Sequence, residues 1–288
     1  MTMSGTATTV QSEHTVLGVV NRWTALAERT LAVAASLRVT AAYAVVLVAV
    51  SVTLAALGRH ARDVVVGQMS TNVHNLAHGQ LTALVGSAFV CDDGGVCVWL
   101  PGLLCLLALG ELIWRSRGLL IAFAVGHIGA TLIVAVELAA ALKAGWLPIS
   151  VARATDVGIS YGAVCVLGAL TASIPSRWRP AWVGCWLGIA AVAAFSADFT
   201  AVGHIVALLL GMGLSFRLRS IERWTTSQVA LLTVGSAFAY CMLSGSLVVA
   251  PVAGLAGALV AVLLSRVLRS HSTDRADPAP VPLPQSAL

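Results

Sequence analysis

Charged residues are scarce in this sequence. Asp, Glu, Lys and Arg together make up only 10% of its 288 residues, whereas hydrophobic residues make up 58%. A soluble domain carries roughly 25% charged residues, so this chain has too few to cover a surface that faces water. The mean hydropathy of +0.91 agrees with this. The composition therefore excludes a soluble globular domain and predicts an integral membrane protein.

Signals of two other classes are also missing. No Lys/Arg-rich run with interleaved aromatic residues occurs, so the net charge of +5 does not indicate a nucleic-acid partner. Residues 1–14 are polar, and no short apolar segment followed by a small-residue cleavage site opens the chain. We therefore expect no cleavable signal peptide, and the first apolar run should act as an uncleaved anchor.

Long apolar runs fill most of the chain instead. A membrane-spanning helix needs ~20 apolar residues, and the sequence offers about eight such runs. The predicted spans are about 38–58, 98–114, 119–142, 157–174, 181–197, 199–216, 228–246 and 249–265. The predicted fold class is all-α: a polytopic transmembrane helical bundle embedded in a lipid bilayer.

The basic residues predict how these spans cross the membrane. If the N-terminus is cytoplasmic, thirteen Lys/Arg residues fall on the cytoplasmic side and four on the outer side, as the positive-inside rule requires. The outer four are Arg59, Arg62, Lys143 and Arg153. We predict a multi-pass plasma-membrane protein with an even number of spans and both termini in the cytoplasm.

Two groups of metal-ligating residue types lie in the predicted outer loop, residues 59–97. His74 and His78 have the i, i+4 spacing that could hold a metal on a helix, but Asn75 stands where a metalloprotease carries Glu, so a polar loop face is the preferred interpretation and no metal is expected. Cys91 and Cys97 flank a polar turn. They could form a disulfide in an oxidising compartment or remain free thiols.

Polar residues inside spans are costly, so each one is a candidate for function. Ser160 lies four residues past Asp156, about 6 Å deep in the span over 157–174, and His204 lies six residues past Asp198, about 9 Å deep in the span over 199–216. Small residues that permit close helix approach accompany both. They are Gly158 and Gly162 on the first span, and Gly203, Ala207 and Gly211 on the second. A Ser nucleophile and a His general base could therefore meet near the outer surface.

These motifs resemble those of the rhomboid intramembrane serine proteases. That family carries its nucleophile in Gly-x-Ser-Gly-Ala at the start of the fourth span, and this chain is similar at 158–162, with Gly168-Ala169 following. Its sixth span carries a His followed by small residues, as at 203–211. Two further stretches look similar: 86–89 in the first outer loop, and 110–118 after the second span. The likeness covers residues 38–216, which would be a rhomboid-like six-span core.

The resemblance divides the chain into four parts. Residues 1–37 would be a partly amphipathic cytoplasmic segment and 38–216 the six-span core. Two additional transmembrane helices would occupy 228–268, and 269–288 would be a disordered Pro-rich cytoplasmic tail.

The resemblance implies an intramembrane serine protease without a cofactor, in which Ser160 attacks a transmembrane substrate and His204 moves the proton. Two departures oppose full activity. Tyr161 replaces the Gly that follows the nucleophile, and Val98 and Gly102 stand where the family places the His and Asn that support the oxyanion. Backbone N–H groups near Ser160 would then have to stabilise the oxyanion, with Gly158, Tyr161 and Gly162 as the supporting residues.

The alternative is an inactive rhomboid-like protein that binds transmembrane helices as clients. The missing oxyanion donors favour this alternative, and the presence of both Ser160 and His204 favours the protease. A small-solute transporter has little support, because few charges lie inside the spans.

Overall fold

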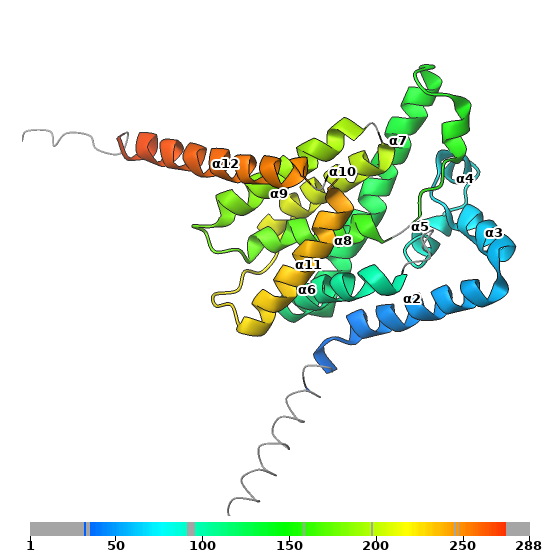
Figure 1. Cartoon of the computed structure of the whole chain (residues 1–288), viewed down its shortest axis with the longest axis horizontal. Coiled ribbons are helices and arrows are strands. Elements are labelled where there is room, and N and C mark those ends of the chain that lie inside the picture. Colours follow the sequence, from blue (N-terminus) through cyan, green and yellow to red (C-terminus); the bar gives the residue numbers. More distant parts are fainter. Residues whose placement is uncertain are drawn as a thin grey trace, which may run out of the picture.

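The structure is a computed structural model that describes residues 32, 35–90, 96–157, 159–196, 198–244, 246 and 248–274. Helices dominate this described part and no strand occurs in it. Five helical stretches in it are long and apolar enough to cross a membrane. The fold is therefore the predicted polytopic helical bundle, shown in Figure 1.

The first long helix, α2 (Arg38–Leu57), lies along one edge of the bundle (Figure 1). It leads into three short helices at the far end: α3 (Arg59–Met69), α4 (Val73–Ala77) and α5 (Ala83–Gly86). These occupy the region that the sequence predicts to be an outer loop. The loop is thus folded into helices and turns.

The next apolar stretch contains two spans joined at a bend. Helix α6 (Val96–Ala124) continues through a π-helical turn, η1 (Val125–Gly129), into α7 (Ala130–Lys143). Arg115 interrupts α6 with non-helical dihedral angles, φ 59° and ψ 174°. The bend falls between the two spans predicted at 98–114 and 119–142, so the 46-residue apolar stretch Val98–Lys143 crosses the bundle twice.

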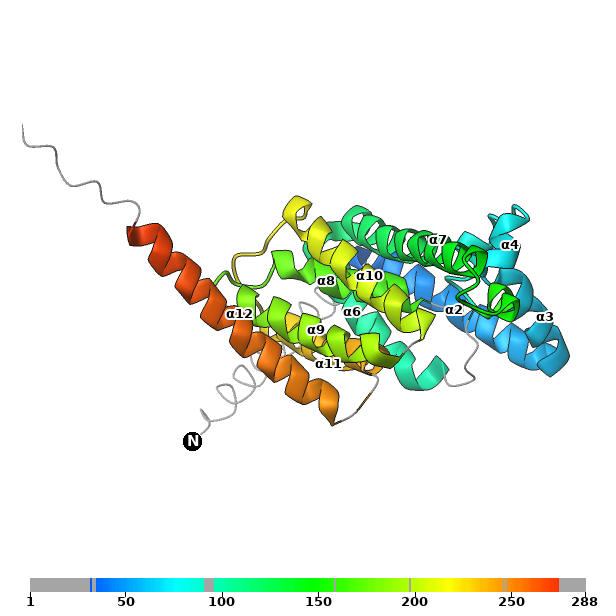
Figure 2. The same cartoon turned by 90° about the horizontal axis from the view of Figure 1, so that it is seen from above.

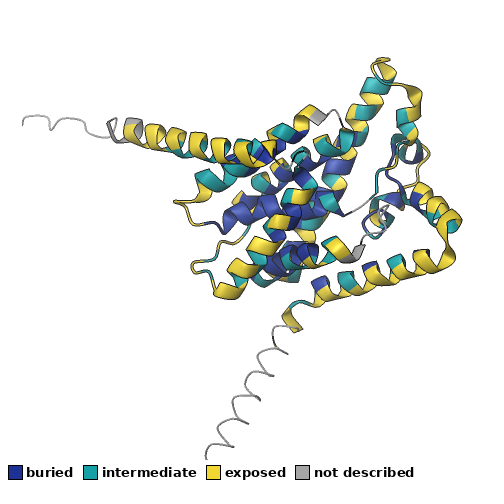
Figure 3. Cartoon of the chain, in the orientation of Figure 1, coloured by how far each residue is buried: buried dark blue, intermediate teal, exposed yellow. Residues whose placement is uncertain are grey.

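Helix α8 (Ser160–Ala169), extended by the 3-10 turn η3 (Leu170–Ala172), is the central element. Every residue from Tyr161 to Ala172 is buried. The 13 residues Ser160–Ala172 span only about 20 Å at 1.5 Å per residue, so α8 with its extension is shorter than a ~30 Å hydrocarbon layer. A helix enclosed by protein on all sides does not need to match that thickness. Figure 3 shows the buried residues gathered around it.

Helices α9 (Arg179–Ala193), α10 (Phe199–Leu214), α11 (Thr226–Leu243) and α12 (Val249–Asp274) complete the bundle. Three 3-10 turns lie between helices: η2 (Ile149–Arg153), η4 (Ala194–Ser196) and η5 (Ser215–Arg217). Helix α11 packs on α6 and also touches α8, α9 and α10. Helix α12 packs on α9 and extends away from the rest of the molecule (Figures 1 and 2).

Small residues allow the two closest helix contacts. A Cβ added at Gly168 of α8 would meet backbone atoms of Leu208 and Met212 on α10, and one at Gly211 would meet the backbone of Cys165. Gly184 and Gly257 make an equivalent backbone approach between α9 and α12. Membrane helices gain van der Waals contact in this way, because lipid supplies no hydrophobic force between them. Helices α8 and α10 are thereby held in a fixed register.

Candidate functional site

The site begins where the chain enters α8. Ser160 is the first residue of the helix and is half-buried, and its hydroxyl makes no hydrogen bond to any part of the chain that the structure describes. No side chain caps this helix end. The first backbone N–H groups of a helix have no carbonyl partner within it and carry a partial positive charge. They are the donors that a negatively charged oxygen near Ser160 would meet.

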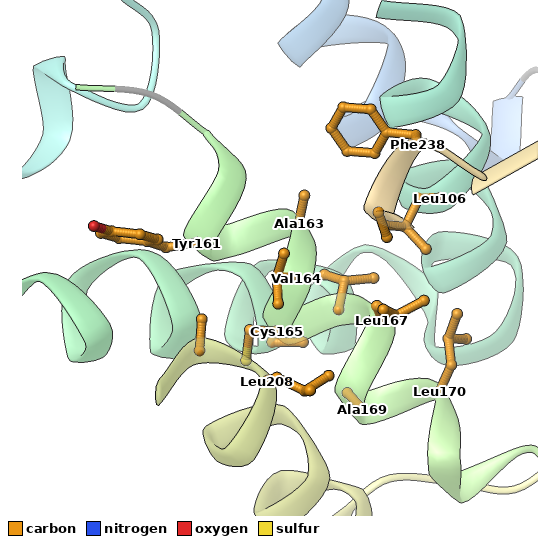
Figure 4. Packing of buried hydrophobic residues seen from close by; sticks show 14 of the residues in the cluster. Leu106, Tyr161, Ala163, Val164, Cys165, Leu167, Ala169, Leu170, Leu208 and Phe238 are labelled. Carbon is orange, nitrogen blue, oxygen red and sulfur yellow. The ribbon is translucent and has the colours of Figure 1, made fainter. Parts of the chain in front are cut away.

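Tyr161 turns its ring toward α10. Its side chain is only 3% exposed, and Figure 4 shows its hydroxyl pointing away from the aliphatic residues of the core. A Cβ at Gly203 would overlap the Tyr161 ring, so the ring occupies space that only Gly leaves open. The Tyr161 hydroxyl has no hydrogen-bond partner within the described residues. At position 161, where the rhomboid motif has Gly, this chain therefore has a Tyr whose ring is well packed against α10.

His204 lies beside this ring, in the second turn of α10. The two ring centroids are 5.2 Å apart and the rings meet edge to face at 79°. His204 is 7% exposed, and its Nε2 atom has no hydrogen-bond partner in the described structure. No hydrogen bond joins Ser160 to His204 among the described residues. A buried polar atom without a partner in a native fold needs a functional or structural explanation.

A cavity of about 230 Å³ opens at His204. Asp198 and Thr200 at the start of α10 line it, and the end of α11 closes one side through Met242, Leu243 and Ser244. Asp198 caps α10 by accepting a hydrogen bond from the Thr200 N–H at 3.1 Å. This cavity is a space beside His204 in which a reacting group could sit.

A buried polar network attaches the outer loop to the segment that precedes α8. The N–H and the hydroxyl of Thr71 both donate to the Asp156 carbonyl, at 2.8 and 2.9 Å, and the hydroxyl also lies 3.0 Å from the Asp156 carboxylate. The Asp156 N–H donates to the Ser70 hydroxyl at 2.9 Å. Asp156 lies four residues before Ser160, so this network holds the outer loop against the segment on the N-terminal side of α8.

Burial raises the pKa of the Asp156 carboxyl above its ordinary value of 3.8, and the charge of Asp198 acts in the same direction. The Thr71 hydroxyl, which lies 3.0 Å from the carboxylate, opposes this shift. The protonated form of Asp156 is thus favoured by folding. A neutral carboxyl at this position would keep its hydrogen bonds to the outer loop without placing a second charge beside Asp198.

Asn75 does not face the catalytic candidates. Its side-chain amide donates to the carbonyls of Gly67 and Ser70, both at 2.8 Å, and its N–H donates to Asn72, which caps α4. Both amide hydrogens are used in holding the loop together. Asn75 therefore offers no donor for an oxyanion in this structure.

His74 and His78 lie together on the surface of the outer loop. Their ring centroids are 4.3 Å apart, and His78 Nδ1 lies 2.7 Å from the His74 carbonyl. No group of three or more His, Cys, Asp or Glu residues in the described part of the chain could hold a metal ion. The two imidazole rings therefore contact each other at the surface of this loop.

A second Ser–His pair is buried between the outer loop and η1. The Ser87 hydroxyl lies 3.1 Å from Nε2 of His127, which also lies 3.1 Å from the Leu84 carbonyl. Ser87 is fully buried and His127 is 4% exposed. A peptide bond cannot reach a pair enclosed in this way. The pair therefore holds the outer loop against η1, within the third predicted span.

The two positions where rhomboids carry oxyanion donors face elsewhere. Val98 is 86% exposed, and a Cβ at Gly102 would meet the Phe238 side chain of α11. A side chain at 102 is thus excluded by α11. Helix α11, which lies beyond the six-span core, therefore occupies the space that a donor side chain at position 102 would need.

The structure does not describe some of the predicted site residues. Gly158, Cys91 and the side chain of Cys97 lie outside the described residues, so the predicted disulfide and the first supporting residue stay predictions. Gly162 packs against the Phe123 ring, and Ala207 is fully buried against α8.

Sequence reasoning did not find the role of two groups: Ser70 and Thr71, which bind Asp156, and the carboxylate of Glu111. The sequence signal for Ser70 and Thr71 was a polar run near an apolar span. The signal for Glu111 was a carboxylate within an apolar run.

Comparison with known proteins agrees with this geometry. The chain matches the family described as rhomboid-like protein over residues 32–224, which is more than half of its length. No curated protein and no solved structure matches it. The matched region includes α8, α10, the outer loop and the bend at Arg115. The chain belongs to the rhomboid-like protein family.

Proposed function

We propose that the protein is an intramembrane serine peptidase of low turnover that acts on transmembrane protein substrates. The observation that carries the proposal is the buried Nε2 atom of His204, which has no hydrogen-bond partner among the described residues, on a residue that lines the cavity near the start of α10. The general base in a Ser–His dyad needs such an atom. Hydrogen bonds in a catalytic dyad are often loose before substrate binds, so the absence of a Ser160–His204 bond is compatible with this role.

The chemistry uses side chains of α8 and α10 alone. The Ser160 oxygen attacks the carbonyl carbon of the scissile peptide bond, and its proton passes to His204 Nε2. The C–N bond then breaks, and His204 returns the proton to the leaving amine. A water molecule then gives a proton to the same imidazole and attacks the acyl carbon, the ester C–O bond breaks, and His204 returns the proton to the Ser160 oxygen. Backbone N–H groups at the start of α8 stabilise the oxyanion.

The missing side-chain donors set the expected rate. Removing one oxyanion donor lowers kcat by ~10²–10³, and neither Val98 nor Gly102 can supply one. Because such donors act on charge that develops in the transition state, we expect weak turnover with normal substrate binding.

The test is cleavage of a model transmembrane substrate by the full chain in liposomes, together with labelling by a fluorophosphonate. Ser160→Ala should abolish both. Ser87→Ala is the matched control, because it removes a buried serine that lies 3.1 Å from a different histidine, His127, and it should leave labelling in place once folding is verified. Cleavage that persists in Ser160→Ala would overturn the proposal.

One specific observation favours the second candidate function, a non-proteolytic protein that binds transmembrane helices. Helix α11 excludes a side chain at Gly102, so Gly102→Asn fits only together with Phe238→Ala. If this double variant, with Val98→His added, folds and binds substrate but still cleaves nothing, the binding function replaces the peptidase. Client helices should then co-purify equally with wild type and Ser160→Ala.

A further inference from the structure

Two adjoining cavities lie at the end of the bundle opposite to Ser160. The larger, about 760 Å³, lies between the bend of α6 and the segment that links α10 to α11. The other, about 490 Å³, lies between α9, η3 and the end of α10. Leu218 and Ser220 line both cavities, so the two adjoin at these residues, and together they are called the hollow.

The larger cavity is strongly basic. Arg115, Arg219 and Arg223 line it, with Glu222 as the single carboxylate among the lining residues. None of these three guanidinium groups makes a hydrogen bond or ion pair to the part of the chain that the structure describes. Their donors are therefore available to a ligand, and a guanidinium suits the oxygens of a phosphate.

Arg115 stands in a backbone conformation that disfavours a side chain. It is the only non-Gly residue with positive φ among the described residues, at φ 59°. Strained backbone of this kind costs ~1–3 kcal/mol and tends to persist where function needs it. Glycine would adopt this conformation freely. Because the Arg115 guanidinium makes no bond within the described chain, its side chain contributes no visible contact that offsets the strain.

The strained bend is held rigidly. The Trp114 indole N–H donates to the Arg219 carbonyl at 3.1 Å, and a Cβ at Gly118 would overlap the Trp114 side chain. The link between Trp114 and Arg219 fixes the segment that carries Arg219 and Arg223 against the bend. The arginines are thus arranged by the fold around one space.

The adjoining cavity is mainly apolar. Val183, Met212 and Phe216 line it, and Phe216 is 90% exposed at its edge. Arg179 lies at the same cavity and donates to the carbonyls of Ala172 and Ile174, which holds its charge at the helix ends. An apolar space beside a basic one matches a molecule with a hydrocarbon chain and an anionic head.

We propose that this hollow binds an anionic phospholipid, with the phosphate headgroup among Arg115, Arg219 and Arg223 and an acyl chain against Met212 and Phe216. Basic pockets between transmembrane helices on the cytoplasmic side are known to bind such headgroups. A soluble phosphate compound shares the headgroup chemistry but has no use for the apolar cavity. The lipid source therefore accounts for both halves of the hollow.

The test uses the full chain in neutral detergent. Thermal unfolding is measured with added phosphatidylglycerol, with phosphatidylcholine and with inorganic phosphate, and bound lipid is counted by native mass spectrometry. Phosphatidylglycerol should raise the unfolding temperature by several degrees, and the other two should not. An equal effect of inorganic phosphate would assign the site to a soluble phosphate compound. An equal effect of phosphatidylcholine would mean that the anionic headgroup is not recognised. Either result would overturn the lipid proposal.

Variants locate the site. Arg219→Gln with Arg223→Gln should weaken phosphatidylglycerol binding at least tenfold, and Arg115→Gly should weaken it while the bend keeps its backbone conformation. The matched control is Arg177→Gln with Arg266→Gln, two arginines that do not line either cavity. An equal loss in the control would mean that general surface charge binds the lipid. The site lies at the other end of the bundle from Ser160, so its result is independent of the proposed peptidase activity.

Discussion

The carboxyl of Asp156 lies where the outer loop meets the segment before α8, and the charge of Asp198 at the start of α10 acts on it. This carboxyl accepts a hydrogen bond from the Thr71 hydroxyl at 3.0 Å, and burial is the main cause of its raised pKa. The same residue could carry a charge or remain neutral, and its burial favours the neutral form. This makes the anchoring of the outer loop sensitive to pH.

We predict that the protein loses stability as pH rises above the ordinary Asp pKa of 3.8 toward the raised value in the folded state. Folding favours the protonated form, so the stabilisation from Asp156 is fully present below 3.8 and is lost as the folded-state group deprotonates. Thermal unfolding in detergent across this range should show the decline in wild type and not in Asp156→Asn. The exposed Asp63→Asn is the control and should keep the decline. A wild-type unfolding temperature that rises over this range would contradict the assigned direction.

Helix α2 depends on a carboxylate from another helix. Glu111 of α6 is 1% exposed and accepts hydrogen bonds from the N–H groups of Val39 and Thr40 at 3.0 and 2.8 Å. The hydroxyls of Thr40 and Ser116 donate to it as well, both at 2.7 Å. The carboxylate thus satisfies N–H groups that the start of α2 leaves open, and its charge suits the positive end of the helix.

Removing this carboxylate should therefore loosen α2. We expect Glu111→Ala to destabilise the protein by about 2–4 kcal/mol, because it leaves several buried donors without an acceptor, each worth about 1–3 kcal/mol. Glu111→Gln keeps one carbonyl oxygen and should lose clearly less. Equilibrium unfolding in mixed detergent measures both variants. Equal stability of Glu111→Ala and wild type would show that water or lipid replaces the carboxylate.

Most helices were predictable from the sequence because apolar runs mark them, whereas α9 and α8 with η3 are shorter than a typical membrane span. The predicted break between 114 and 119 coincides with the bend at Arg115, where charges interrupt the apolar pattern. The packing of α11 against Gly102 was not predictable, since neither its periodicity nor its length says which helix it contacts. The Asp156 network was also missed. It joins residues 85 positions apart, and local patterns contain no information on such pairs.

At the scale of the whole molecule, the basic residues gather at one end. Hydrogen bonds from Val39 and Thr40 to Glu111 bring the start of α2 next to the bend that carries Arg115. The basic cavity adds Arg219 and Arg223, and the apolar cavity adjoining it adds Arg179. The contacts of Gly184 with Gly257 and Ala261, and of Gly188 with Ala253, show that α12 runs antiparallel to α9, so its Arg-containing end lies at the start of α9. These arginines all belong to the thirteen that the sequence assigns to the cytoplasmic side.

We predict from this arrangement that both termini lie in the cytoplasm. The Arg-rich end should face the cytoplasm because Lys and Arg near span ends set the orientation of a membrane protein. An alkaline phosphatase reporter fused at either terminus should be inactive, and a green fluorescent reporter should be fluorescent. A reporter inserted at Gly145, in the turn between α7 and η2, is the control and should give the opposite pattern. Alkaline phosphatase activity at the C-terminus alone would mean an odd number of crossings, and α12 would then lie along the membrane surface. Activity at both termini with none at 145 would invert the orientation, and it would place the basic cavity on the outer side, away from the anionic cytoplasmic leaflet.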